Sequence, residues 1–553
     1  QLSSFPLTVN GKIDRKALPE ATIIQEDNYV APINETEKKL IEIWAKILDV
    51  KEKQISVERD FFELGVNSIN AFQTLIQIKK QFSKTIEVGH IFSHRTIRTL
   101  ANFLDTLETT SEEKIPKVSD EGLVVTSSAQ ERMFYYYLMD KESLVYNIAG
   151  GIMIDGHLDQ KTLKSSIESV INRHPSLRTG FVYNEEGVFQ KVFEKGHINF
   201  EIFNSGSVNL DDAFKNFVRP HNLESGEPVS FGLYKISETK NILFIDVHHI
   251  AADGYSLKIL MNDLKKLLKG EVLKKLSTNY LDYASWQRQK DIQKQQAYWA
   301  NQLDGNLPQL ELSYVGDTEE TELANAQLEQ LVIEGEAFEK INQLIKEKGI
   351  TNFMFLISIY YLLLHKITGN NDIIIGSDVL GRTNTATREI VGTFVNILPL
   401  RFKINPEQSF SDFLNAVKKL VLDAFHNQDF QFDEMVKMVG INSNASKKPP
   451  IAQVHFAFDD FNYNEQAFNA GDLSFTPVEL NRRGTTQYEF KLDASKNNNS
   501  FNIGFVYSEN LYEKETIKVF LNYYFNIINY VLRNDQLPIR DIDVNYSAEI
   551  ITY

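Results

Sequence analysis

Hydrophobic positions recur along the chain with two different patterns, and the change between them divides the sequence. Residues 35–48, 68–82 and 96–107 place apolar side chains every three or four positions, which predicts three amphipathic helices. Short helices joined by modest loops indicate a small bundle over residues 31–108. From residue 122 onward, helical patterns alternate with short apolar, β-branched runs, which is typical of an α/β fold.

Two histidines stand where a predicted strand of the second part passes into a helix. The residues before His248 read as a buried strand, and those after Ser256 place their apolar side chains on one helical face. Ser256 is the expected N-cap, and Gly270 follows the expected last turn. Adjacent residues of a strand point to opposite faces, so we expect one inward, orienting histidine and one working imidazole beside a cleft.

Composition limits the class of protein. The 553 residues are 42% hydrophobic and 24% charged, which predicts a globular protein of several domains. No apolar run approaches the roughly 20 residues that span a bilayer, and no signal peptide opens the chain, so we expect a cytoplasmic protein with no membrane partner. The absence of cysteine excludes disulfides and thiolate metal sites, and we expect no metal. A net charge of −16 argues against a nucleic-acid partner.

Ser68 lies at the start of a predicted helix, and Leu64 and a glycine stand shortly before it, with two residues between that glycine and Ser68. Its ordinary role would be that of an N-cap. A helix N-terminus also favours a bound anion, so the hydroxyl is equally a candidate for modification with a phosphodiester. The segment resembles the LGxxS site of peptidyl carrier proteins, and this resemblance implies that 4'-phosphopantetheine is attached to Ser68. Val66 and Asn67 depart from the more usual residues at loosely specified positions.

The turn from His248 to Gly254 resembles the HHxxxDG signature of the condensation domains of nonribosomal peptide synthetases, which chloramphenicol acetyltransferase-like acyltransferases share. Further blocks that resemble this family follow its order at residues 127–133, 173–181, 280–287, 391–401 and 426–433. Bacterial synthetases of the tyrocidine type resemble the chain most. One block departs, because lysines at 447 and 448 replace an Arg-Asn-Pro-like stretch, and no role is assigned to them.

The resemblance covers nearly the whole chain and implies a multidomain protein, a small all-α four-helix carrier bundle followed by an α/β condensation domain of two chloramphenicol acetyltransferase-like lobes. The chain has no initiator Met, so we expect it to be a piece of a larger protein. The expected parts are an adenylation-domain remnant (1–30) in which Lys12 is no longer a working residue, the carrier (31–108), a polar linker (109–121), the N-terminal lobe (122–295), the C-terminal lobe (296–546) and an exit tail (547–553).

The implied reaction is amide formation in a tunnel between the lobes. The α-amine of an aminoacyl group on a downstream carrier attacks an upstream aminoacyl or peptidyl thioester. An amine with a pKa of about 8 is about one-tenth neutral at pH 7, so removing its proton is worth about 1.4 kcal/mol. Alignment of two tethered substrates is worth roughly 7–11 kcal/mol, so positioning should dominate. His249 is expected to hold the amine and to accept a proton, whether or not it is a true general base.

Other residues, both in the turn and far from it in sequence, have expected roles. Gly254 is expected to donate an N–H to the oxyanion. Asp253 is either a catalytic carboxylate or the partner of a buried arginine, and we favour the second with Arg382 as that arginine. His248 and Asn396 are expected to support the site. The implied partners are adenylation domains on either side, a downstream carrier and a phosphopantetheinyl transferase.

Related activities of the same fold are alternatives. Heterocyclisation domains replace the histidines with aspartates, and the block at residues 391–401 matches condensation rather than epimerisation. Free-standing acyl transfer and a non-catalytic docking module remain open. The linker leaves no room for an epimerisation domain after the carrier, and residues 127–133 lack the His-rich motif of dual epimerisation and condensation domains. We therefore expect a domain that joins an L-donor to an L-acceptor.

Overall fold

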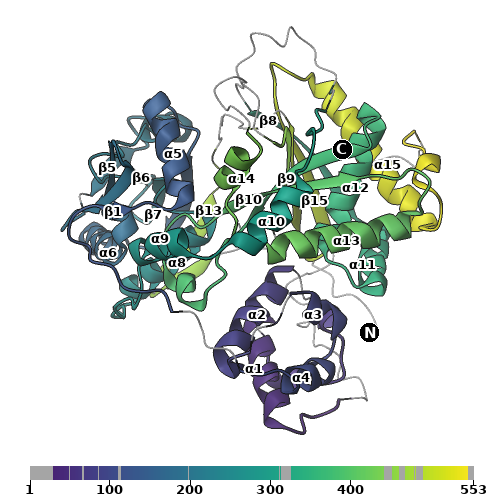
Figure 1. Ribbon diagram of the computed structural model, residues 1–553. Helices are drawn as coiled ribbons and strands as arrows, with labels where there is room; N and C mark the ends of the chain where they lie inside the picture. Colours follow the sequence, from purple (N-terminus) through teal and green to yellow (C-terminus); the bar gives the residue numbers. More distant parts are fainter. Residues whose placement is uncertain are drawn as a thin grey trace, which may run out of the picture. The chain divides into compact units, whose positions relative to one another are not determined.

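The computed structural model describes the protein over residues 29–48, 50–64, 68–84, 86, 88–109, 114–196, 198–310, 312, 326–440, 451–459, 467–478, 480, 488 and 490–545. They form two compact units with a boundary after residue 110 (Figure 1). The predicted adenylation remnant up to residue 28, the lysines at 447 and 448 and the tail after residue 546 lie outside the described residues.

The first unit is a bundle of short helices, α1 (Glu35–Leu48), α2 (Ser68–Phe82), α3 (Val88–Ser93) and α4 (Ile97–Asp105). The α1 and α2 helices have the predicted bounds. The α4 helix lies within its predicted range, because Thr96 caps it by accepting the N–H of Thr99 at 3.2 Å. The sequence pattern does not predict α3, whose six residues are too few to show a period. In the core, the rings of Trp44 and Phe61 stack at 4.4 Å.

The second unit begins with a lobe built on a six-stranded sheet in the order β12-β13-β2-β7-β6-β5. Its strands are β2 (Asn147–Asp155), β5 (Asn199–Asn204), β6 (Val229–Lys235), β7 (Lys240–His248), β12 (Phe468–Ala470) and β13 (Leu473–Val478). The helices of this lobe are α5 (Ser128–Met139), α6 (Gln160–Arg173), α7 (Leu210–Phe217) and α8 (Gly254–Leu268), and a small sheet joins β1 (Val124–Val125), β4 (Gly187–Val192) and β3 (Thr179–Asn184). Apolar side chains of β7, α6 and α8, such as Leu243, Ile167 and Leu260, share one buried core.

A second six-stranded sheet, in the order β10-β9-β11-β14-β15-β8, forms the other lobe. Its strands are β8 (Ala326–Glu334), β9 (Asp372–Val379), β10 (Asn396–Lys403), β11 (Val454–Asp459), β14 (Phe490–Lys496) and β15 (Ser500–Ser508). The helices are α11 (Gly335–Lys348), α12 (Asn352–Thr368), α13 (Phe410–His426), α14 (Phe432–Met438) and α15 (Lys514–Arg533). The buried ring of Tyr360 on α12 lies 6.1–6.3 Å from the rings of Phe456, Phe490 and Phe505, so α12 packs on one face of this sheet.

The two lobes are not consecutive stretches of the chain, which corrects the predicted division at residue 295. That position falls inside α10 (Gln293–Gln302), which follows α9 (Tyr280–Gln289) and packs toward the second lobe, where the indole N–H of Trp299 donates to the carbonyl of Asn427 at 2.9 Å. Later in the chain, β13 returns to the first lobe and pairs antiparallel with β2 (Figure 1). The pairing of short, distant strands leaves no local sequence signal.

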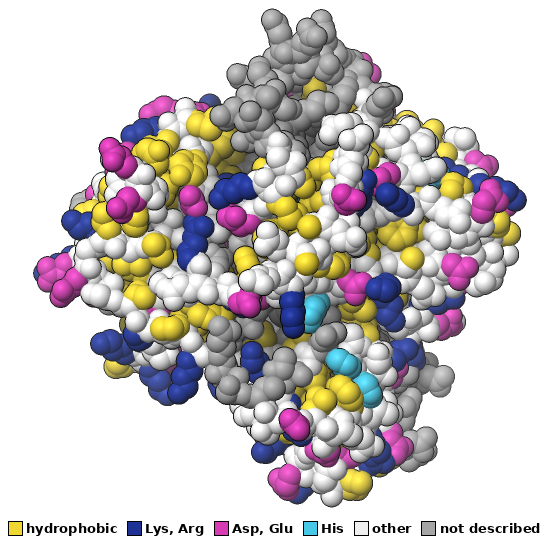
Figure 2. Space-filling view, viewed as in Figure 1, with side chains coloured by type: hydrophobic (Ala, Val, Ile, Leu, Met, Phe, Trp, Pro, Cys, Tyr) yellow, Lys and Arg dark blue, Asp and Glu magenta, His cyan; other side chains and the backbone are white. Residues whose placement is uncertain are grey.

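The surface charge and the apolar length of the helices bear on which partners the protein could have. Acidic and basic side chains are mixed over the visible face (Figure 2). In the described part of the chain, no single helix is long and apolar enough to cross a bilayer; α11 and α12 reach that composition only together, across a 107° bend. The residues described contain no cluster of three or more potential metal ligands.

Candidate functional site

The candidate site lies at the turn from β7 to α8. Here the predicted cap is wrong, because Asp253 rather than Ser256 is the N-cap of α8. The backbone of Asp253 is extended, and its Oδ1 accepts the N–H of Ser256 at 2.8 Å. Gly270 follows the last turn as predicted, with a φ of +78° that favours glycine. Two good capping residues three positions apart made the start of the helix ambiguous.

The two histidines point to opposite sides of the strand. His248 is buried, its Nδ1 accepts the N–H of Ile250 at 3.1 Å, and its ring lies beside those of Tyr146 and His221. Burial, reinforced by His221 and His249, lowers the pKa of His248 to about 3. His248 is therefore a neutral, inward-facing residue at neutral pH.

His249 is only partly buried and is held from both its backbone and its ring. Its backbone N–H donates to the carbonyl of Tyr146 at 2.7 Å, and its Nδ1 lies 3.4 Å from Oγ1 of Thr393. Burial lowers the pKa of His249 below its ordinary value, against the opposing effects of Asp253 and Asp378. The imidazole is therefore neutral at neutral pH, and its Nε2 is able to accept a proton.

Asp253 and Arg382 form a buried ion pair between the lobes. Nη2 of Arg382 lies 2.9 Å from Oδ1 of Asp253, and the carboxylate is fully inaccessible to solvent. Oδ2 of Asp253 accepts the N–H of Phe394 at 3.0 Å, and the guanidinium lies 3.9 Å from the centre of the Phe394 ring. Nη1 of Arg382 donates to the carbonyl of Ile390 at 2.8 Å. Because the carboxylate is enclosed by these groups, it does not face the cleft.

The segment that begins at Gly392 contacts both Ser256 and Asp253. The N–H of Gly392 donates to Oγ of Ser256 at 3.1 Å, and the carbonyl of Gly392 accepts the N–H of Asp253 at 3.1 Å. A Cβ at Gly392 would lie 1.8 Å from the ring of Tyr280, whose hydroxyl donates to the carbonyl of Thr393. Glycine is required there because the backbone must lie directly against an aromatic ring. Blocks far apart in sequence thus meet around His249.

Asn396 and Gly254 occupy different positions. The amide of Asn396 donates to the carbonyls of Gln428 and Phe430, each at 2.9 Å, and accepts the N–H of Phe432 at 3.0 Å. Asn396 therefore fastens the loop before α14 and does not face His249. Gly254 is the first residue of α8 and has no positive φ, so backbone strain does not require glycine there. Its N–H has no acceptor within the helix and remains available.

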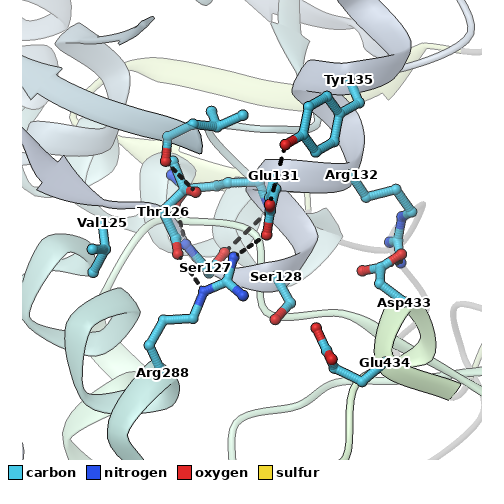
Figure 3. Close-up of polar contacts among 12 residues, drawn as sticks. Val125, Thr126, Ser127, Ser128, Glu131, Arg132, Tyr135, Arg288, Asp433 and Glu434 are labelled. Atoms are coloured by element: carbon cyan, nitrogen blue, oxygen red, sulfur yellow. Dashed lines mark hydrogen bonds and ion pairs between the residues drawn. The ribbon is translucent and has the colours of Figure 1, made fainter. Parts of the chain in front are cut away.

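An ion pair between α5 and α14 also joins the two lobes of the second unit (Figure 3). Nη1 of Arg132 on α5 lies 3.2 Å from both carboxylate oxygens of Asp433 on α14. Glu131 binds Arg288 instead, and Nε of Arg288 donates to the carbonyl of Thr126 at 2.8 Å. The charge of Arg132 also contributes to the lowered pKa of His249, so this bridge is within electrostatic reach of the imidazole.

Ser68 is the first residue of the 15-residue α2. Its side chain is outside what the structure describes. The first-turn N–H groups of a helix and its dipole suit a phosphodiester, so the position fits a phosphopantetheine arm.

Sequence reasoning missed several residues of the site. Thr393 and Tyr280 lie inside blocks that resemble the family, and Ser256 follows the turn from His248 to Gly254, but nothing in their local pattern shows that they meet. Asp378 and His455 belong to strands of the second lobe, where a charged residue in an apolar run was the one available signal. The block at residues 391–396, which contains Gly392 and Thr393, would have been the best guide.

A buried cross-lobe ion pair beside a histidine at a strand-to-helix turn is the central feature of the two-lobed unit, which follows a helical bundle in the chain. Residues 120–549 match the family model "Condensation domain", and residues 38–104 match "Phosphopantetheine attachment site". The chain belongs to the condensation-domain family and carries a phosphopantetheine attachment domain before it, which confirms the predicted family, fold class and cofactor.

Similar proteins include tyrocidine synthase 3 of Brevibacillus parabrevis, 31% identical over 99% of this chain and 8% of that protein. Bacitracin synthase 3 of Bacillus licheniformis is 30% identical over 100% of this chain and 9% of that protein. The chain thus spans less than a tenth of the length of these two relatives.

Among solved structures, a complex of the X-domain and OxyB from teicoplanin biosynthesis matches with a TM-score of 0.71 at 16% identity, over 80% of this chain and all of that one. The condensation domain of the Monacolin K polyketide synthase MokA matches with a TM-score of 0.65 at 20% identity, over 76% of this chain and 99% of that one. These likenesses show the fold alone.

Proposed function

We propose that this chain is a carrier and condensation pair of a nonribosomal peptide synthetase, acting in the cytoplasm, and that its condensation domain forms an amide bond. The observation that carries the proposal is the placement of His249 at the turn from β7 to α8. It is partly exposed, its backbone N–H donates to the carbonyl of Tyr146, and its Nδ1 lies beside the hydroxyl of Thr393.

In the proposed reaction, Nε2 of His249 holds the acceptor amine and accepts a proton as the amine attacks the thioester carbonyl. The C–N bond forms, the tetrahedral oxyanion is stabilised by the N–H of Gly254, and the C–S bond then breaks. The proton held by His249 goes to the departing sulfur, so the imidazole returns to its neutral form. Asp253 takes no part in proton transfer, because its oxygens are occupied by Arg382, Ser256 and Phe394.

Ser68 would hold the phosphopantetheine arm, which supplies a terminal thiol that carries the donor as a thioester. The N-terminus of α2 would favour the phosphate beside it. The proposed partners are adenylation domains on either side, a downstream carrier that presents the acceptor, and a phosphopantetheinyl transferase.

Two measurements test the proposal. The protein is incubated with coenzyme A and a phosphopantetheinyl transferase, and the intact mass is compared with that of Ser68→Ala, with Ser56→Ala as control. Only Ser68→Ala should fail to gain the arm. The loaded protein is then mixed with an acceptor carrier bearing an aminoacyl group, and mass spectrometry should detect a dipeptide on the acceptor. A correctly loaded, folded protein that forms no dipeptide with any acceptor would support a docking module instead.

A further inference from the structure

One face of the second sheet carries a group of charged and polar side chains. His455 on β11 pairs with Gly376 of β9 on one side and with Lys491 of β14 on the other. Because alternate residues of a strand share a face, Asp378, His455, Lys491 and Asp493 lie on the same face. We call these four residues the charged strip.

The charged strip lies on the face opposite to α12. The alternate residues, Phe456 and Phe490, face the ring of Tyr360 on that helix. On the strip side, a Cβ at Gly376 would lie 3.2 Å from Cδ2 of His455, so the imidazole ring lies over β9 beside Asp378. The strip is therefore not covered by the α12 layer.

Asp378 is an anion that faces open space near the working imidazole. Its side chain is 42% exposed. Burial would raise the pKa of Asp378, but interactions with His455, Lys491 and His249 outweigh it and hold the pKa at about 2. Asp378 in turn raises the pKa of His249, so the two side chains are within electrostatic reach of each other.

His455 is a buried polar side chain whose hydrogen-bonding capacity is not used in full. It is 1% exposed, and its ring stacks at 4.4 Å on that of Tyr488. Its Nε2 lies at an ion-pair distance of 3.3 Å from Oδ1 of Asp378, and neither ring nitrogen has a hydrogen-bond partner among the residues that the structure describes. A buried imidazole nitrogen without a partner is costly unless a ligand supplies one.

The charge of the strip is unbalanced. Nζ of Lys491 lies 2.9 Å from Oδ1 of Asp493, so that lysine is already engaged by a carboxylate. Asp378, Asp493 and Lys491 together carry one formal negative charge more than positive charge. The complementary ligand is a single cation with hydrogen-bond donors, and an ammonium group supplies three.

We propose that Asp378 and His455 form a subsite for a cationic, amine-bearing side chain of an aminoacyl substrate. This inference rests on the proposed function. No hydrogen bond joins Asp378 to His249 in the described part of the chain, so the subsite is separate from the imidazole that holds the reacting amine. The ammonium donates to the exposed Asp378 carboxylate, which His455 supports from its buried side at 3.3 Å, and the same chemistry serves a donor or an acceptor residue.

The test compares amide formation by the loaded protein in four pairings, with leucine or ornithine as donor and leucine or ornithine as acceptor. Ornithine should be preferred roughly tenfold or more in one arm, because a hydrogen bond to a charged group is worth about 1.5–3 kcal/mol. If the preference appears when the donor is varied, the cation belongs to the donor residue. If it appears when the acceptor is varied, the cation belongs to the acceptor residue. Asp378→Asn should abolish the preference, measured as the ratio of the ornithine rate to the leucine rate within the same variant, because a change in the chemical step common to both substrates cancels in that ratio.

Two further variants sharpen the result. Asp211→Asn, an exposed position on α7, should keep the preference. Asp378→Lys should favour glutamate over ornithine in the same arm, because the sign of the charge is reversed. Equal rates for leucine and ornithine in both arms, or a preference that survives Asp378→Asn, would overturn the subsite while leaving amide formation intact. A failure to form amide in every pairing would instead overturn the proposed function and the subsite with it.

Discussion

Arg382 and Asp253, 129 residues apart in sequence, meet at 2.9 Å with both side chains buried. Arg382 follows β9 of the second lobe, and Asp253 caps α8 of the first. Gly381 makes the approach possible, because its φ is +62° and a Cβ there would lie 1.9 Å from the carbonyl oxygen of Phe394. One contact thus fixes the helix that follows His249 and the segment that carries Thr393.

Asp253→Ala is expected to destabilise the protein by about 3–5 kcal/mol, since it leaves the Arg382 guanidinium buried without its carboxylate. Chemical denaturation of the two proteins measures the difference. Asp159→Ala is a matched control, because Asp159 is the exposed N-cap of α6 and its loss should cost only about 1 kcal/mol. A fully stable Asp253→Ala protein that has merely lost activity would contradict the structural role and favour a catalytic carboxylate.

The buried state of His248 predicts a dependence of stability on pH. The pKa of His248 is about 3 in the folded protein, below the unfolded value of about 6.5, so the unfolded chain binds more protons between these limits. The stabilising contribution is therefore complete above pH 6.5 and is lost as the pH falls toward 3. From pH 6.5 to 5, His248 should cost roughly 2 kcal/mol.

His248→Asn isolates that contribution, because Oδ1 of asparagine is able to accept the N–H of Ile250 without titrating. Urea unfolding at pH 7.5 and pH 5 should show a smaller loss of stability for His248→Asn than for the wild type. Equal losses in the two proteins would show that His248 is free to become protonated in the folded state.

The stereochemistry of the donor is a separate prediction. We expect a donor on Ser68 whose last residue has the L configuration to react faster than its D epimer, because no epimerisation domain lies between the carrier and the condensation domain. Matched dipeptidyl arms that differ only at the terminal α-carbon, offered with one acceptor carrier, give the ratio of rates. Faster transfer of the D epimer would assign the domain to the D-donor type.

Local sequence patterns predict the parts of the structure that local forces decide. The bounds of α1 and α2, the end of α8 shortly before Gly270 and the different surroundings of His248 and His249 follow from helical period, capping and strand alternation. The resemblance to a family suggested Arg382 as the partner of Asp253, which no period or spacing would show.

Long-range packing explains what the sequence did not predict. The return of β13 to β2 joins strands hundreds of residues apart, and the contact of Thr393 with His249 depends on how the two lobes meet. The charged strip is visible only once the register of β9, β11 and β14 is known, because its members come from three separate strands.

The most direct measurement is dipeptide formation by His249→Ala, with the wild type and His157→Ala, an exposed position, as references. Each protein is loaded on Ser68, its loading and folding are verified by intact mass and circular dichroism, and transfer to an acceptor carrier is timed. If His249 holds the amine and accepts its proton, His249→Ala should lose roughly 100-fold or more in rate, while His157→Ala matches the wild type. A loaded, folded His249→Ala protein that forms dipeptide at the wild-type rate would contradict the assignment of His249.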